Sequence, residues 1–217
     1  MKKILFQSDN EPLSALTHFI GILLSIAGLV LLVVYASIKG DAYMITGFSI
    51  FGASLILLYS ASTIYHFISK ETKAKRIFQK IDHSMIYVLI AGTYTPICIA
   101  ALGGAWGWSL FGAIWFLAAL GIVWKSAFKM NKIISTIFYV IMGWLAVIAF
   151  IPLKSQLSPG ALFWLFLGGL LYTLGAVIFS IESKFKKRKW FSLHDLWHVF
   201  VMAGSFAHFW LMFKYII

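Results

Sequence analysis

Seven stretches of this chain are apolar and long enough to cross a lipid bilayer, and they constrain the fold more than any other feature. A transmembrane α-helix needs about 20 mainly apolar residues. The connections between the stretches are short, which leaves no room for a separate soluble domain in a chain of 217 residues. The sequence predicts an all-α membrane protein, one seven-helix transmembrane domain over residues 1–217. We expect its helices at residues 14–38, 42–68, 81–102, 106–124, 133–152, 161–181 and 191–213.

The composition excludes the common classes of soluble protein. Hydrophobic residues make up 61% of the chain and charged residues 12%, against roughly 45–50% and about 25% in ordinary globular domains. A soluble fold of this size could not bury so much apolar surface. The single cysteine, Cys98, excludes an internal disulfide and a cysteine-rich metal site. The chain is therefore not expected to be a cytosolic enzyme, a secreted disulfide scaffold or a disordered protein.

The basic residues predict the orientation in the membrane. Of the 18 lysines and arginines, fifteen fall in the N-terminal segment and in the second, fourth and sixth connections, which share one face of a seven-helix protein. The opposite face has only Lys39, Lys154 and Lys214. Because basic loops stay in the cytoplasm, we expect a cytoplasmic N-terminus and an external C-terminus. The net charge of +11 lies in these loops, so it favours anionic lipid headgroups and argues against nucleic acid as a partner.

Most ionisable residues of the predicted helices fall in one layer near the cytoplasmic face. Charged and titratable side chains are costly in hydrocarbon, so each one is a functional candidate. His208 is the exception, because it lies fourteen residues beyond His194, or about 21 Å along the last helix. The layer contains Glu11, His18, His66, Asp82, His83, His194, Asp195 and His198.

Three histidines of this layer form a pattern that is typical of a zinc site. His194 and His198 are four residues apart and share one helix face, and His66 is the natural third ligand. Three histidines with an open position are typical of catalytic zinc. Asp82 would either be a fourth ligand of a closed structural site or hold a water molecule beside the metal. The alternative for His194 and His198 is an interfacial pair that is hydrogen-bonded to its neighbours.

Three separated motifs resemble the bacterial hemolysin III family, within the progestin-and-adiponectin-receptor superfamily. The first is Glu11 followed by Thr17-His18 at the start of the first helix. The second is Ser62 with His66 four residues later and then Asp82. The third is the pair His194 and His198. The resemblance runs from Glu11 to about His208, and departs from the receptor branch at Ser14, where that branch usually has Asn.

The resemblance implies a zinc ion, Zn²⁺, bound by His66, His194 and His198. It also implies that Asp82 contacts the water of the metal, that Ser62 lies close by, and that the chain is related to membrane lipid hydrolases of the ceramidase type. We therefore expect a multi-pass protein of the bacterial cell membrane that hydrolyses a lipid amide or ester. The catalytic candidates are Asp82 and Ser62, and the partners are membrane lipids. The alternatives are a zinc-stapled lipid sensor without enzymatic activity and a cytolytic protein. The sequence names no protein partner and no substrate.

Overall fold

The computed structural model describes residues 11–69, 72–128, 131–185 and 192–217, and these residues form helices and no strand. Six helices are long and apolar enough to cross a membrane, and a seventh span results if one bent pair of helices is counted as a unit. The predicted all-α membrane bundle is confirmed. The helices are α1 (Pro12–Lys39), α2 (Ala42–Phe67), α3 (Lys73–Pro96), α4 (Gly104–Ala127), α5 (Lys132–Gly143), α6 (Phe150–Gln156), α7 (Pro159–Ile181) and α8 (Leu193–Leu211).

Short helical turns of other types extend four of these elements. The π-helical turn Ile97–Leu102 continues α3, and the π-helical turn Met212–Ile216 continues α8. The 3-10 turn Glu182–Lys184 follows α7, and another, Leu145–Val147, lies between α5 and α6.

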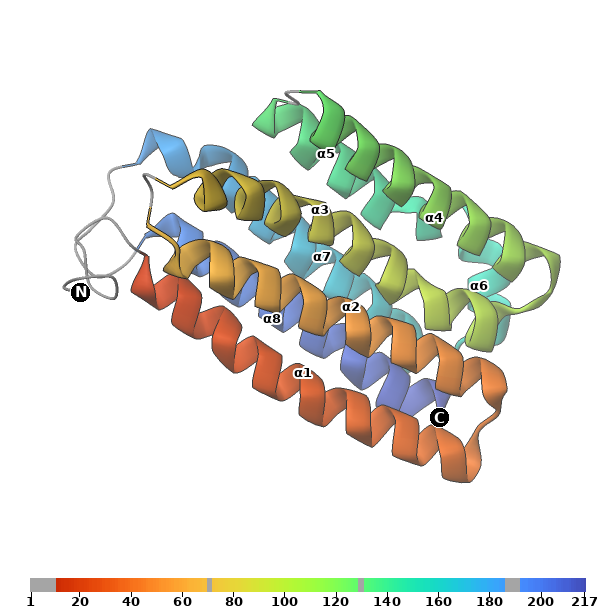
Figure 1. Cartoon of the computed structure of the whole chain (residues 1–217). Helices are drawn as coiled ribbons and strands as arrows, with labels where there is room; N and C mark the ends of the chain where they lie inside the picture. The colour runs from red at the N-terminus through yellow and green to blue at the C-terminus, as the bar shows by residue number, and fades with distance from the viewer. Residues whose placement is uncertain (1–10, 70–71, 129–130, 186–191) are drawn as a thin grey trace.

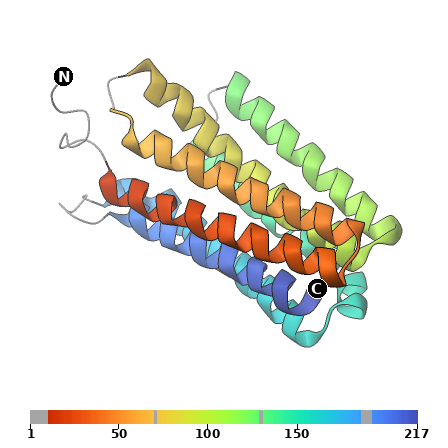
Figure 2. The ribbon, with the colours of Figure 1, turned by 60° about the horizontal axis from the view of Figure 1, so that its bottom comes forward.

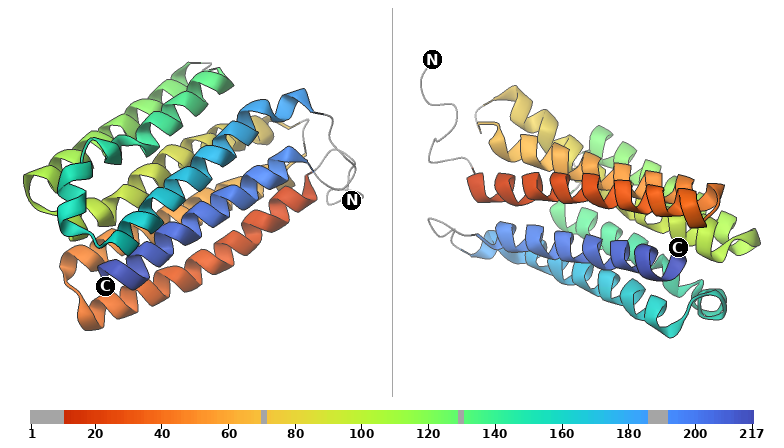
Figure 3. Two further views of the ribbon diagram at one scale, coloured as in Figure 1. Left: turned by 180° about the vertical axis from the view of Figure 1, so that it is seen from behind. Right: turned by 90° about the horizontal axis from the view of Figure 1, so that it is seen from below.

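The long helices run side by side along one axis, with the start of α1 at one end of the bundle and the end of the chain after α8 at the other (Figure 1). Helix α1 packs between α2 and α8, as the views in Figure 2 and Figure 3 agree, and α3 and α7 continue the bundle beside α2 and α8. Large apolar side chains are exposed along the outer faces of the helices, including Leu24, Phe116 and Val123. Such a surface suits contact with lipid, and the chain is a multi-pass membrane protein.

Helix α3 begins earlier than its apolar span suggested. It starts at Lys73, after the Thr72 side chain, which accepts a hydrogen bond from the backbone N–H of Lys75. The first turns carry Lys73, Lys75, Arg76 and Lys80, so hydropathy marks only the later, membrane-embedded part of the helix. Asp82 therefore does not open the helix but lies nine residues inside it.

The predicted span over residues 133–152 is broken. The segment Lys132–Val147, which contains α5 and the 3-10 turn after it, meets α6 at an angle of 54°, and the Tyr94 side chain of α3 interrupts the backbone ladder just before this bend. Its hydroxyl donates to the carbonyl oxygen of Gly143 and accepts from the backbone N–H of Ala146, both at 2.8 Å. A side chain inserted into the backbone ladder in this way is a recognised cause of helix kinks.

The membrane orientation of the bundle stays a prediction. Part of the charge count rests on residues outside those that the structure describes: Lys2, Lys3, Lys70, Lys129, Lys186, Lys187, Arg188 and Lys189. A reporter that is active only in the cytoplasm should work when it is fused after Lys75 and fail after Ile217.

Candidate metal centre

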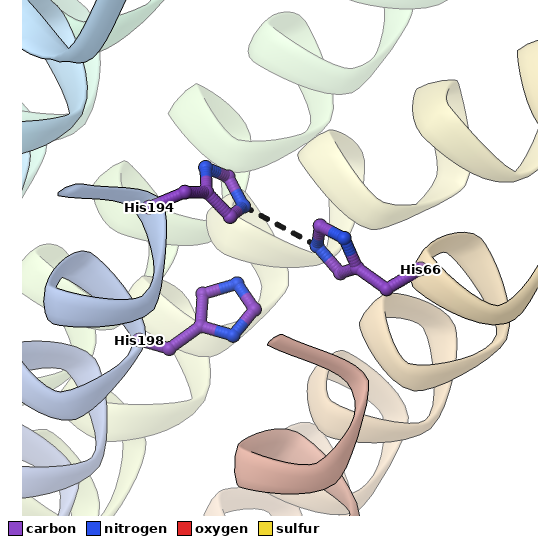
Figure 4. A group of neighbouring side chains, drawn as sticks. All are labelled: His66, His194 and His198. Carbon is purple, nitrogen blue, oxygen red and sulfur yellow. Dashed lines mark hydrogen bonds between the residues drawn. The ribbon is translucent and has the colours of Figure 1, made fainter. Parts of the chain in front are cut away.

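Two helices that pack in the same bundle bring the three predicted ligands together (Figure 4). His66 lies near the end of α2, and His194 and His198 occupy the first two turns of α8. A capping box fixes the start of α8: the Ser192 side chain accepts from the backbone N–H of Asp195, and the Asp195 carboxylate accepts from the backbone N–H of Ser192. Asp195 is therefore part of the cap, and the cap fixes the start of the helix that carries His194 and His198.

The three imidazoles converge on one point. One ring nitrogen from each of His66, His194 and His198 lies within 4.8 Å of the others, and the Nε2 atoms of His66 and His194 are 3.2 Å apart. His66 and His198 are buried, and His194 is partly buried. The three residues form the only such group of metal-ligand side chains within residues 11–69, 72–128, 131–185 and 192–217.

The other ring nitrogen of each histidine is held by a hydrogen-bond acceptor. The Nδ1 atom of His66 lies 2.9 Å from the Glu11 carboxylate, and that of His194 lies 2.8 Å from the Glu182 carboxylate. The Nδ1 atom of His198 lies 3.1 Å from the backbone carbonyl oxygen of Ser14. Carboxylate and carbonyl oxygens only accept, so these contacts assign the proton to Nδ1 in all three rings. Each Nε2 is then left with a lone pair that faces the shared point.

This arrangement fits a zinc ion. Tetrahedral zinc with Zn–N bonds of about 2.0–2.1 Å places neighbouring ligand nitrogens about 3.3 Å apart, close to the 3.2 Å between His66 and His194. Two lone pairs facing each other at this distance repel, and a cation between them would remove the repulsion. A carboxylate on the distal nitrogen of a ligand histidine is also the usual support of a zinc site. The donor set therefore suits zinc.

Asp82 and Ser62 lie beside the histidines without joining their group. Both are buried, and both border the same cavity as His194 and His198. The Ser62 hydroxyl donates a hydrogen bond to the Asp82 carboxylate. The group of ligand atoms that lie within 4.8 Å of one another does not include the Asp82 carboxylate. Asp82 therefore lies next to the three-histidine group and is not part of it.

The cavity beside the histidines is long and apolar. It has a volume of about 100 Å³ and lies between α3 and α5 on one side and α7 and α8 on the other. Its walls run from His194 to His208, which corresponds to about 21 Å along α8. Apolar residues form most of the wall, among them Leu58, Ile90, Ile97, Leu165, Trp197 and Val201.

The remaining predicted candidates have different surroundings. His18 stacks on His198 with ring centroids 3.5 Å apart, and neither of its nitrogens has a hydrogen-bond partner in the described part of the chain. The backbone carbonyl of His83 accepts a hydrogen bond from the Tyr139 hydroxyl. The imidazole ring of His83 packs edge-on against Phe179. His208 is buried far from the cluster.

Sequence reasoning missed Glu182. This residue follows α7, accepts from His194, and forms an ion pair with Lys132 at 2.6 Å. The chain has only 7 acidic residues, and Glu182 stands at the end of a predicted span on the same face as the histidines. An acidic residue is therefore rare at such a position, and this rarity is the signal in the sequence that marks Glu182 as a candidate.

Known proteins match this chain over nearly its whole length. A family model described as Haemolysin-III related matches residues 6–209. Among curated proteins, the "Hemolysin-3 homolog" of Bacillus subtilis (strain 168) is 45% identical over 212 residues, covering 97% of this chain and 96% of that protein. "Hemolysin-3" of Bacillus cereus is 41% identical over 210 residues, covering 96% and 92%.

A more distant match comes from the "Monocyte to macrophage differentiation factor" of Homo sapiens. It is 27% identical over 172 residues, which cover 77% of this chain and 69% of that protein. The range of the family match includes every candidate residue from Glu11 to His208.

Proposed function

This chain belongs to the haemolysin-III related family of membrane proteins, and on that premise we propose that it is a zinc-dependent hydrolase of a membrane lipid amide or ester. The observation that carries the proposal is the convergence of three Nε2 atoms at one end of a long apolar cavity. Three ligands leave a coordination position open, as catalytic zinc sites do. The cavity offers an acyl chain a place beside that position.

The residues around the cluster suit hydrolysis. Zinc, when bound, supplies a Lewis acid that polarises a carbonyl group and acidifies water. Asp82 would accept the proton of the attacking water as its oxygen bonds to the carbonyl carbon. The C–N or C–O bond to the leaving group then breaks, and the proton passes to the leaving amine or alcohol. Ser62 would donate a hydrogen bond to the Asp82 carboxylate and so hold it toward the cluster.

The supporting residues act through the imidazoles. Glu11 and Glu182 fix the rings of His66 and His194 and raise the basicity of their Nε2 atoms. The apolar wall of the cavity excludes bulk water, which strengthens every charge interaction at the site.

A structural staple is the second candidate. His66 belongs to α2 and His194 to α8, so a bound metal would tie two helices that are distant in sequence. Metal binding of this kind contributes directly to stability. The two candidates differ in what they require of Asp82.

The test compares wild type with Asp82→Asn. Zinc content, melting temperature and hydrolysis of lipid amides and esters are measured on the same samples. A catalytic role predicts retained zinc and a loss of hydrolysis by about 10²–10⁴-fold, the usual contribution of a general base. Asp41→Asn is the matched control, because Asp41 caps α2 at the opposite end of that helix from His66.

Two outcomes would count against the hydrolase. Wild-type hydrolysis in Asp82→Asn would remove Asp82 from the reaction. Loss of zinc together with a fall in melting temperature would favour the staple, in which Asp82 is a fourth ligand.

A further inference from the structure

His208 is a buried polar side chain that the proposed reaction does not use. It is 4% exposed, and its Nδ1 atom has no hydrogen-bond partner among the residues that the structure describes. Leaving such a group unpaired is costly, and natural proteins rarely do so without a reason. The imidazole therefore calls for a partner that is not part of the chain.

The imidazole borders the same cavity as the metal cluster. His208 is ten residues beyond His198 on α8, so the two side chains stand about 15 Å apart along the helix. Gly168 of α7 makes room for the ring, because a Cβ atom at that position would meet the Nε2, Cε1 and Cδ2 atoms of His208 within 2.8 Å. The ring therefore packs directly over Gly168, and His208 also borders the cavity.

The neighbouring hydroxyl groups of the cavity wall are already paired. The Tyr172 hydroxyl is bonded to Ser205, the Thr173 hydroxyl donates to the backbone of Gly169, and the Tyr94 hydroxyl bridges Gly143 and Ala146. His208 differs from them, because its imidazole borders the cavity while its buried Nδ1 atom has no hydrogen-bond partner within the described residues. A ligand group is the partner that its position allows.

We propose that His208 selects lipid acyl chains that carry a hydroxyl group part-way along their length. A neutral imidazole has one donor and one acceptor nitrogen, and a hydroxyl group can pair with either one. An unsubstituted chain would leave the imidazole unpaired, whereas a hydroxyl at the matching depth would satisfy it. This inference rests on the proposed lipid function, since the cavity must admit an acyl chain next to the cluster.

The test measures binding and needs no turnover. Octadecanoic acid and hydroxyoctadecanoic acids, with the hydroxyl near the carboxyl end, near the middle or near the methyl end, displace a fluorescent fatty acid from the purified full-length protein. We expect wild type to bind one of the hydroxylated chains about 10-fold more tightly than the plain chain, the scale of pairing one otherwise unsatisfied buried group.

Three variants identify the residue responsible. His208→Leu should bind the plain chain at least as well as wild type and lose the preference. Gly168→Ala keeps the imidazole but forces it to move, so it should weaken the preference. Tyr172→Phe is the matched control: this residue also borders the cavity beside His208, but its hydroxyl is already bonded to Ser205, so the preference should remain. Melting temperatures confirm that each variant is folded.

The outcomes separate this inference from the proposed function. Equal binding of plain and hydroxylated chains by wild type would overturn it, and so would an unchanged preference in His208→Leu. Either result leaves the hydrolysis test with Asp82→Asn intact. Conversely, a preference that depends on His208 stands even if the protein hydrolyses none of the lipids.

Discussion

Two polar regions inside this membrane protein use their hydrogen bonds in opposite ways. At the break between α5 and α6, the Tyr94 hydroxyl both donates and accepts, and the nearby Trp144 indole donates to Thr173 at 2.9 Å. At the other region, His66, His194 and His198 each use one nitrogen and turn the second toward a common point.

The comparison distinguishes polar groups that stabilise the fold from polar groups that are arranged to bind a ligand. A polar group whose bonds are all made within the protein stabilises a backbone shape, here a bend of 54°. Convergent lone pairs stabilise nothing until a cation joins them, so such a cluster costs stability unless it binds a ligand. The first region also contains only neutral groups, whereas the second includes the carboxylates of Glu11 and Glu182.

The largest effect should come from removing a ligand. His66→Ala, His194→Ala and His198→Ala should each reduce zinc from near full occupancy to near none, because two imidazoles hold the ion far less tightly than three. Metal content after purification, measured by mass spectrometry, checks this expectation, and melting temperature should fall with the metal.

His208→Ala is the control for the ligand set, since it removes a buried histidine from the other end of the cavity. It should keep its zinc. Loss of zinc in His208→Ala together with retention in His66→Ala would show that the ligand set is wrong.

A smaller effect should come from Glu182, which holds His194 without joining the cluster. Glu182→Gln removes the charge that fixes the Nδ1 proton of His194, and zinc affinity should fall about 10–100-fold, the usual effect of losing such a support. Competition with a zinc chelator measures the affinity. Asp41→Asn again serves as the matched control, and an unchanged affinity in Glu182→Gln would show that the ring needs no support from this carboxylate.

The three histidines of the cluster could be predicted from the sequence more readily than the residues that hold their Nδ1 atoms. Apolar length defines membrane helices, and spacing along a helix puts His194 and His198 on one face, so both could be anticipated. The partner of each Nδ1 depends on how α1 begins and how α7 ends beside the cluster. Glu182 contacts His194 only because the 3-10 turn after α7 brings it there, and no periodicity encodes that contact.

The same limit explains the two differences between the predicted and the observed helices. Hydropathy cannot detect the first turns of α3, which are polar and basic. The break after Gly143 is set by Tyr94, about fifty residues away in sequence. The hydropathy of residues 133–152 predicts one span, because it depends only on these residues and not on Tyr94, which lies elsewhere in the sequence.

Tyr94→Phe tests the role of the hydrogen bonds at the break between α5 and α6. Without the hydroxyl, the Gly143 carbonyl and the Ala146 N–H lose a shared partner in a buried setting, which should cost about 1–3 kcal/mol of unfolding free energy. Zinc affinity should not change, because the bend lies away from the cluster. Unfolding in detergent by a chemical denaturant measures the first quantity and chelator competition the second.

Tyr59→Phe is the matched control, since the buried Tyr59 hydroxyl donates one hydrogen bond within the described residues, to the Ser205 hydroxyl at 2.8 Å. It should cost about 0.5–1.5 kcal/mol, the net value of one ordinary hydrogen bond. If both tyrosine variants were equally stable, the two hydrogen bonds of the Tyr94 hydroxyl would not be what stabilises the bend.

The smallest effect should come from Ser192→Ala. This residue makes a structural hydrogen bond, and it does so on the helix that carries two of the proposed metal ligands. Ser192 caps α8, and the cap sets the start of the helix that carries His194 and His198. Loss of the side-chain cap should cost about 1 kcal/mol of unfolding free energy. The helix start is also held from α1, because the Ser14 hydroxyl donates to Asp195 at 2.6 Å. The α8 histidines should therefore keep their positions, and zinc affinity should change less than in Glu182→Gln. A larger loss of zinc than of stability in Ser192→Ala would mean that the cap, and not the carboxylates behind the rings, does most to place the ligands.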